Sequence, residues 1–194
     1  METKGEVRIS PRYSRDDYHM LNLAIMSDDL VWERAVDIFI DRIQGRYLNQ
    51  IDSLSCDINA NGFAIMALNC LLVEALYQFE NGLEKTEKGN KAAYAKFLKR
   101  LDPVSFCDVA LAEEFYTNIR CGILHSAQTK AESRLSDRDD FVVTVDNNIL
   151  LVSVKGVSRI VKHHVHDYAN RLRDSAEVEL REKFIKKMTF VCRK

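Results

Sequence analysis

Apolar residues recur at helical spacing along most of the chain. From Trp32 to Leu54 they fall largely on one side, with charged residues opposite, which predicts an amphipathic helix. From Asn59 to Glu80 they cover nearly the whole circumference, a pattern typical of a helix buried inside a bundle. The same spacing predicts further helices over 14–26, 92–101, 106–124 and 157–187.

The pattern changes once, before the last predicted helix. Two β-branched runs, Phe141–Val145 and Ile149–Val154, flank the turn-forming cluster 146–148, which predicts a β-hairpin. Polar residues 126–140 predict an exposed loop, and Met1–Arg12 a loosely held lead-in. We therefore expect one all-α domain over residues 1–194: an antiparallel bundle of about five to six helices, with the hairpin at about 141–154 as an insert.

Charge and cysteine content narrow the classes of function. The 194 residues carry a net charge of −1, so any contact with RNA must rest on local patches or a dimer groove. The five cysteines form no C-x-x-C pair, which indicates free thiols in a reducing compartment. We see no signal peptide, and the longest apolar run, Phe63–Val73, is too short to cross a bilayer. We therefore expect a cytoplasmic protein with no membrane contact.

The segment Phe115–His125 carries the chemistry that the pattern does not explain. Arg120 and His125 bracket an otherwise apolar stretch that contains Gly122. Guanidinium matches the oxygens of a phosphate, and imidazole serves as acid or base near neutral pH. In a regular helix the two side chains would lie on different faces, unless the helix ends near Leu124 and His125 swings back. The alternative is a helix end whose basic side chains cap carbonyl groups.

Glu74 lies within the most apolar helix and needs a partner, because an isolated buried charge is costly. Either it hydrogen-bonds locally at a seam, or it pairs with an arginine and orients it.

Two other groups invite a functional interpretation. His163 and His166 share a helix face and could bind a metal, but no cysteine or carboxylate completes a site, so we favour a polar helix face. Basic residues near the C-terminus suggest RNA binding or, more simply, solvated helix-end residues. These are Arg181, Lys183, Lys186, Lys187, Arg193 and Lys194. We expect neither a metal nor a cofactor.

The segment Asn118–His125 resembles the signature of the HEPN superfamily (higher eukaryote and prokaryote nucleotide-binding domains), an Arg and a His four to six residues apart at a helix end. The helix around Glu74 resembles the one that precedes this signature in some bacterial members. The resemblance implies a metal-independent endoribonuclease of a toxin or phage-defence system, acting on RNA as a homodimer, with an antitoxin or defence protein as partner. His125 would be the general acid or base and Arg120 would stabilise the transition state, with Glu74, Cys121 and Asn118 in support.

Two positions depart from that signature. Cys121 stands where active members commonly have a polar residue, and Ala127 where a subset has a modified tyrosine. Cys121 and the near-neutral charge favour a second hypothesis, a non-catalytic helical module that binds RNA or nucleotides or assembles with proteins. A His125 buried against backbone carbonyls would support the module. Convergence of Arg120 and His125 across a two-fold cleft would support the nuclease.

Overall fold

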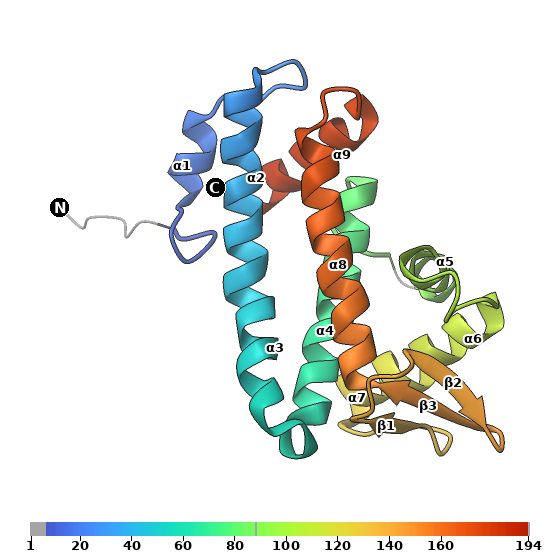
Figure 1. Ribbon diagram of the computed structural model, residues 1–194. Helices are drawn as coiled ribbons and strands as arrows, with labels where there is room; N and C mark the ends of the chain where they lie inside the picture. The colour runs from blue at the N-terminus through green and yellow to red at the C-terminus, as the bar shows by residue number, and fades with distance from the viewer. Residues whose placement is uncertain (1–6, 88, 194) are drawn as a thin grey trace. The chain divides into compact units, whose positions relative to one another are not determined.

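The computed structural model describes residues 7–87 and 89–193, which form mostly helices and one small sheet (Figure 1). The helices are α1 (Arg15–Met20), α2 (Asp29–Ile43), α3 (Asn49–Leu54), α4 (Ile58–Asn81), α5 (Lys91–Leu101), α6 (Val109–Glu114), α7 (Cys121–Ser126), α8 (Val154–Arg173) and α9 (Val178–Val191). π-Helical turns Gln44–Leu48 and Phe115–Arg120 join α2 to α3 and α6 to α7, and a 3-10 turn, Ser55–Asp57, precedes α4. The strands are β1 (Arg134–Ser136), β2 (Val143–Asp146) and β3 (Ile149–Ser153).

Contacts divide the chain into two compact units. The first contains the chain up to Asn49, Gln78–Lys85 and the chain from Val165 onward. The second contains Gln50–Tyr77 and Thr86–His164. Helices α4 and α8 each contribute residues to both units.

The first unit is built on an aromatic cluster. The ring of Phe39 lies 5.0 Å from Phe79, 5.3 Å from Tyr168 and 5.9 Å from Phe184, measured between centroids. All four side chains are buried, and such tilted pairs stabilise a core beyond the area they bury. Gly82, with φ +61°, ends α4 in the left-handed conformation, as its position after Asn81 predicts.

At the N-terminus of this unit, the first helix is shorter than predicted, and the segment before it packs more firmly than predicted. Ser14 caps α1 with a capping box, but the helix ends at Met20, whereas the sequence pattern predicts a helix over 14–26. Asn22 adopts a positive φ, which a continuing helix does not allow. Of the predicted lead-in, residues 1–6 lie outside the described part. Ile9 is buried and Arg12 pairs with Asp41 of α2, so the segment that precedes α1 is held against α2.

The C-terminal helix predicted over 157–187 is wrong as a single element. Helix α8 ends at Arg173, and α9 begins at Val178. The buried guanidinium of Arg181 stabilises the break, because its Nε donates to the carbonyl of Leu172 and its Nη2 to that of Arg173. A side chain that satisfies terminal carbonyls acts as a C-cap.

The second unit contains the sheet, whose strand order is β1-β3-β2. β2 and β3 form the predicted hairpin, with Asn147 and Asn148 both at positive φ, as a tight primed turn requires. β1 pairs in parallel with β3 and lies inside the segment predicted as loop, so that prediction is wrong for Arg134–Ser136. Three residues carry too little periodicity to identify a strand.

The predicted burial of α4 on all sides is also wrong. Ile65, Met66 and Leu72 are fully buried, but Phe63 remains 47% exposed and Leu71 43% exposed. One face of this helix is therefore open along the second unit. The bounds themselves, Ile58–Asn81, agree with the predicted 59–80 to within one residue at each end.

By length and composition alone, one helical stretch of the described chain could cross a membrane. Asp29–Asn81 contains an 18-residue window of mean hydropathy 1.5, of which 44% is buried. Apolar helices in the core of soluble proteins meet the same criterion.

Candidate functional site

The structure brings Arg120, His125 and Glu74 together within the second unit. Nη2 of Arg120 lies 2.6 Å from Oε2 of Glu74, and Nη1 lies 3.2 Å from Nε2 of His125. The side chains of Arg120 and Glu74 are 14% and 20% exposed, whereas His125 is exposed. One guanidinium therefore joins a half-buried carboxylate to a solvent-facing imidazole.

The helical geometry explains how the two ends of the motif meet. A π-helical turn ends at Arg120, and α7 continues past His125 to Ser126, where Ala127 adopts the left-handed conformation. The helix therefore ends two residues beyond Leu124, and His125 lies inside it. Side chains in a helix lean toward its N-terminus, so the imidazole of His125 tilts back toward the turn that carries Arg120. The long arginine side chain closes the remaining distance.

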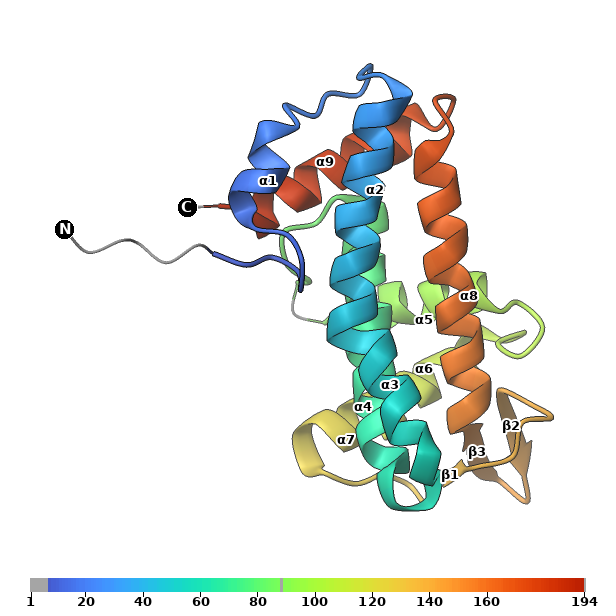
Figure 2. The same cartoon turned by 60° about the vertical axis from the view of Figure 1, so that its left-hand side comes forward.

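Gly122 allows the chain to fold back over this helix. The peptide N–H of Gln128 donates to the carbonyl of Gly122, and that of Lys130 to the carbonyl of Asn118. A Cβ on Gly122 would lie 2.5 Å from the carbonyl oxygen of Gln128, so only glycine fits there. This returning segment holds α7 in place beside α4 (Figures 1 and 2).

Glu74 answers the question that the sequence left open: it pairs with an arginine 46 residues along the chain. Burial by itself lowers the pKa of Arg120, but the hydrogen bond and charge of Glu74 more than offset it, so the pKa lies above its ordinary value. The guanidinium stays charged while its other nitrogen faces His125. Nε of Arg120 is buried and has no hydrogen-bond partner among the described residues.

Tyr116 is a member of the site that sequence reasoning missed. The guanidinium carbon of Arg120 lies 5.3 Å from the centre of its ring, within the range of a cation–π contact. The ring of Tyr94 lies 5.1 Å from Tyr116, and its hydroxyl donates to the carbonyl of Cys70. The available signal was spacing, because Tyr116 lies four residues before Arg120 on the same helical segment.

The two supporting residues differ in how close they come. Sγ of Cys121 lies 3.9 Å from Nη1 of Arg120, where the guanidinium donates to it. Asn118 is buried, and its Nδ2 donates to Glu114 rather than to Arg120 or His125. Cys121 thus borders the site, whereas the side chain of Asn118 bonds Glu114 outside it.

The other candidates lie outside this arrangement. His163 and His166 are exposed on α8, and His164 packs its ring against Phe97 at 5.5 Å. Among the described residues, no group of three His, Cys, Asp or Glu side chains is placed to hold a metal ion.

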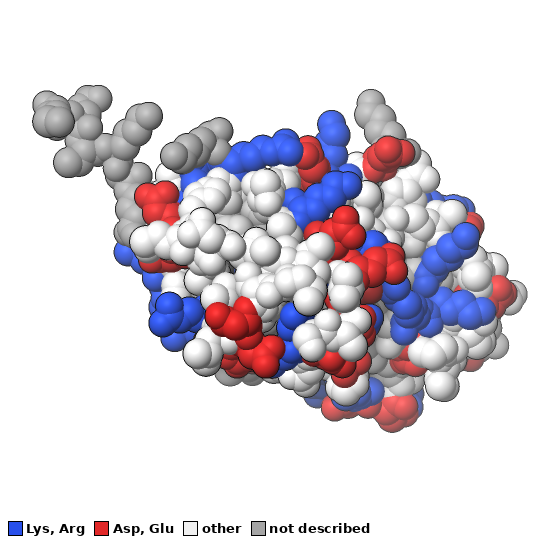
Figure 3. All heavy atoms as spheres, turned by 90° about the horizontal axis from the view of Figure 1, so that it is seen from above, with Lys and Arg blue, Asp and Glu red and all other residues white. Residues whose placement is uncertain are grey.

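The basic C-terminal residues do not form one solvated group. Arg181 and Lys187 are buried, which corrects the expectation that they are ordinary surface residues. Lys183 pairs with Glu179 and Arg193 with Glu84, while Lys194 lies outside the described residues. On the face of the molecule shown in Figure 3, basic and acidic side chains lie interspersed. The described part of that face therefore lacks a broad basic surface that would attract RNA.

The five cysteines are all free thiols, with Cys70 and Cys192 buried. The geometry of Arg120 and His125 is thus the strongest chemical feature that the described residues present. No protein-family model matches the chain, and no curated protein or solved structure is significantly similar to it.

Proposed function

We propose that the protein is an endoribonuclease whose reaction is carried out by Arg120 and His125. The observation that carries the proposal is the 3.2 Å approach of Nη1 to Nε2 at the exposed side of an otherwise half-buried ion pair. A phosphate that enters there meets a fixed positive donor and a base together.

The protonation of His125 follows from its partner. Guanidinium has only donors, so Nε2 of His125 is the acceptor in this contact and carries no proton in this arrangement. An unprotonated Nε2 is ready to take the proton of an RNA 2′-hydroxyl. The resulting oxygen attacks the adjacent phosphorus, the bond to the 5′-oxygen breaks, and a 2′,3′-cyclic phosphate forms. Arg120 stabilises the charge that develops on the phosphoryl oxygens.

The leaving 5′-oxygen needs a proton, which a second imidazole supplies once it has left its contact with Arg120 and is protonated. We propose that a second copy of the chain provides it, so that two Arg120–His125 pairs share one cleft in a homodimer. Base, acid and positive charge then all come from protein side chains, and the mechanism requires no metal or cofactor. Glu74 acts as a positioning residue, because it fixes one guanidinium nitrogen and leaves the other for substrate.

The proposal extends to the family and biological role that the motif suggests. It places the chain in the HEPN superfamily, as a single antiparallel helical bundle with the 141–154 hairpin as an insert. The protein would be a cytoplasmic toxin or phage-defence effector, held in check by an antitoxin or activated by a defence partner. The Arg-x4-His spacing in a mostly helical chain supports this assignment.

The experiment is an RNase assay on purified protein with end-labelled RNA. We expect cleavage that persists in EDTA, leaves cyclic phosphate ends detectable by mass spectrometry, and fails on RNA with a 2′-deoxy sugar at the cut. His125→Ala should abolish cleavage, while the matched control His163→Ala, an exposed histidine on α8, should cut normally. Intact RNA with wild-type protein, or equal cleavage by His125→Ala, would refute the proposal.

A second candidate is a non-catalytic helical module for RNA, nucleotide or protein binding. It is favoured by Cys121 beside Arg120 and by the burial of Arg120 against Glu74 and Tyr116, which also suits a purely structural ion pair. Against it, His125 is exposed and contacts Arg120 instead of a backbone carbonyl. The module predicts that His125→Ala lowers Tm and that wild-type protein cuts no RNA.

A further inference from the structure

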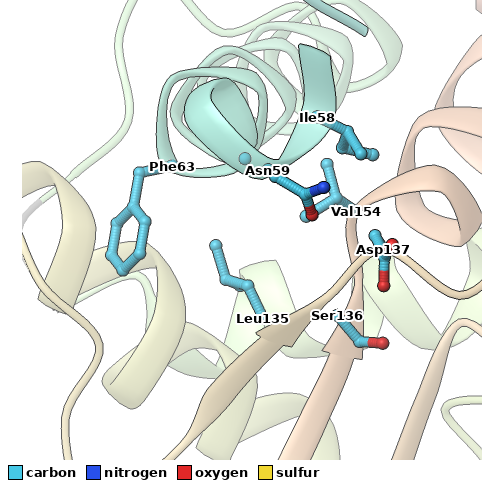
Figure 4. Close-up of a pocket in the computed structure, with 8 residues that line it drawn as sticks. Ile58, Asn59, Phe63, Leu135, Ser136, Asp137 and Val154 are labelled. Carbon is cyan, nitrogen blue, oxygen red and sulfur yellow. The ribbon is translucent and has the colours of Figure 1, made fainter.

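A small open cavity lies in the second unit between the start of α4 and the end of β1. Its volume is about 150 Å³. Figure 4 shows Asn59 and Phe63 projecting from α4, with Leu135 rising toward the helix from the strand below. Ser136 and Asp137 come from the same strand end, on the side away from Phe63. A void of this size takes one six-membered ring, and because the cavity is open, a second fused ring can project toward solvent.

The polar groups of this cavity are free to bind a ligand. Neither the side chain of Asn59 nor that of Asp137 makes a hydrogen bond or ion pair with another residue in the described chain. The neighbours of Asp137 behave differently, since Asp139 pairs with Arg159 and Asp140 with Arg138. The hydroxyl of Ser136 accepts from the peptide N–H of Arg138 and can still donate.

The apolar wall of the cavity is an aromatic ring without an aromatic partner. Phe63 is 47% exposed and, within the described chain, stacks on no other ring. An exposed aromatic face beside hydrogen-bonding groups is the arrangement by which proteins bind unstacked bases of single-stranded RNA.

The cavity and the Arg120 site lie along one face of α4. Phe63 and Glu74 are eleven residues apart, which brings them within about 20° of each other around the helix and about 16 Å apart along it. Between them Ala67 is half-buried and Leu71 exposed, whereas Cys70, on the other side of the line that joins them, is buried, so the helix is open along one side of this path. A short stretch of RNA could therefore reach from one to the other.

We propose that this cavity binds the base of a guanine nucleotide in the RNA substrate, an inference that rests on the proposed nuclease function. A carboxylate only accepts hydrogen bonds, and among the four RNA bases guanine alone presents two adjacent donors, N1–H and N2–H, on its Watson–Crick edge. Asp137 accepts both, Asn59 contacts a remaining edge atom, and Phe63 stacks on the ring.

Calorimetric titration of the full chain with GMP, AMP, CMP and UMP tests the site without any cleavage. We expect GMP to bind about tenfold more tightly than the others, the discrimination expected of one bidentate base contact. Asp137→Asn should remove this preference, and Asp139→Asn, from the same surface segment, should keep it. Equal binding of the four nucleotides, no binding, or an unchanged preference in Asp137→Asn would overturn the proposal.

Gly62→Ala separates binding from folding. A Cβ at Gly62 meets Val154 at an ordinary 3.7 Å, and alanine is the better helix former, so Tm should rise. The added methyl group narrows the cavity, so the affinity for GMP should fall; unchanged affinity would contradict the assignment.

Cleavage assays then distinguish the two proposals. RNA cut without preference for guanine would overturn the guanine site and leave the nuclease proposal intact. Selective GMP binding by a protein that cuts no RNA would overturn the nuclease proposal and leave the guanine site.

Discussion

The buried arginine of the first unit and the half-buried arginine of the second are held in opposite ways. In the first unit, Arg181 is 2% exposed, lies 4.4 Å from the ring centre of Trp32, and donates to two backbone carbonyls. Burial lowers its pKa. In the second unit, the guanidinium of Arg120 bonds a carboxylate, and its pKa is raised.

The difference separates a structural cation from one available to a ligand. The two hydrogen bonds of Arg181 both go to the carbonyl end of α8, and the indole covers its face. Arg120 is anchored on one side by Glu74, while Nη1 meets only the exposed imidazole of His125 and the thiol of Cys121. Nη1 is therefore the nitrogen through which a phosphate would be bound in the proposed reaction, whereas Arg181 has no nitrogen placed in this way.

The largest expected effect comes from replacing the guanidinium of Arg120, whose two terminal nitrogens form a fork of donors, with an ammonium group of the same charge. Arg120→Lys can hold Glu74 or a phosphate, but not both in the present geometry, because ammonium is a single point donor. We expect kcat/KM for RNA cleavage to fall about 100- to 1,000-fold, the range for loss of one transition-state donor. Arg134→Lys, at an exposed site on β1, is the matched control and should retain full activity. Normal cleavage by Arg120→Lys would show that the fork is not needed.

A change of the buried arginine in the first unit should instead reduce stability and leave activity unchanged. Arg181→Met removes the contact with Trp32 and leaves the terminal carbonyls of α8 without their donors. We expect unfolding in urea to show a loss of about 2–4 kcal/mol, with kcat/KM per folded molecule unchanged. Equal stability of the variant would mean that Arg181 does not hold the break between α8 and α9.

This contrast also shows which features could be predicted from the sequence and which could not. Helical periodicity located α4 and α5, and the paired asparagines located the hairpin, because these signals are local. Arg181 and Lys187 were expected at the surface, since periodicity assigns a residue to a face but does not say which element covers it. The sequence did not predict β1 for the same reason, because its three residues are ordered by pairing with β3.

The candidate site was predicted in its residues but not in its geometry. Arg120 and His125 stood out by chemical type, and Glu74 by its apolar setting, yet their spacing in a regular helix placed the first two apart. Their contact depends on a π-helical turn and on the chain folding back over Gly122, both set by tertiary packing. The role of Tyr116 likewise follows only from the position of the guanidinium.

Glu74→Gln tests whether the carboxylate positions Arg120 or merely neutralises it. Glutamine keeps the shape and one acceptor but leaves a half-buried guanidinium without its counter-charge. We expect a loss of about 2 kcal/mol in the free energy of unfolding and a lower kcat with little change in KM. Glu113→Gln, which breaks the more exposed pair with Lys91, is the control and should cost under about 1 kcal/mol. An unchanged kcat would make Glu74 purely structural.

The smallest effect concerns pH and the other buried cation of the first unit. Nζ of Lys187 bonds only neutral oxygens, Oε1 of Gln78 and the carbonyl of Glu84, each at 2.7 Å. Burial, reinforced by the charge of Arg42, lowers the pKa of Lys187 to about 8, against 10.5 for an ordinary lysine. Below pH 8 both the folded and unfolded chains hold the proton, so the cost of burying the charge is constant.

Between about pH 8 and 10.5 the folded chain has released a proton that the unfolded chain still binds. Stability contributed by Lys187 must therefore rise with pH across this window. Lys187→Met, which cannot titrate, lacks this rise, so the stability of wild type relative to the variant should increase by about 1–2 kcal/mol. Denaturation at several pH values measures it, and taking the difference cancels cysteines and tyrosines that titrate in the same range. A flat difference would mean that Lys187 keeps its proton as Arg120 does, and the contrast between the two units would then rest on Arg181 alone.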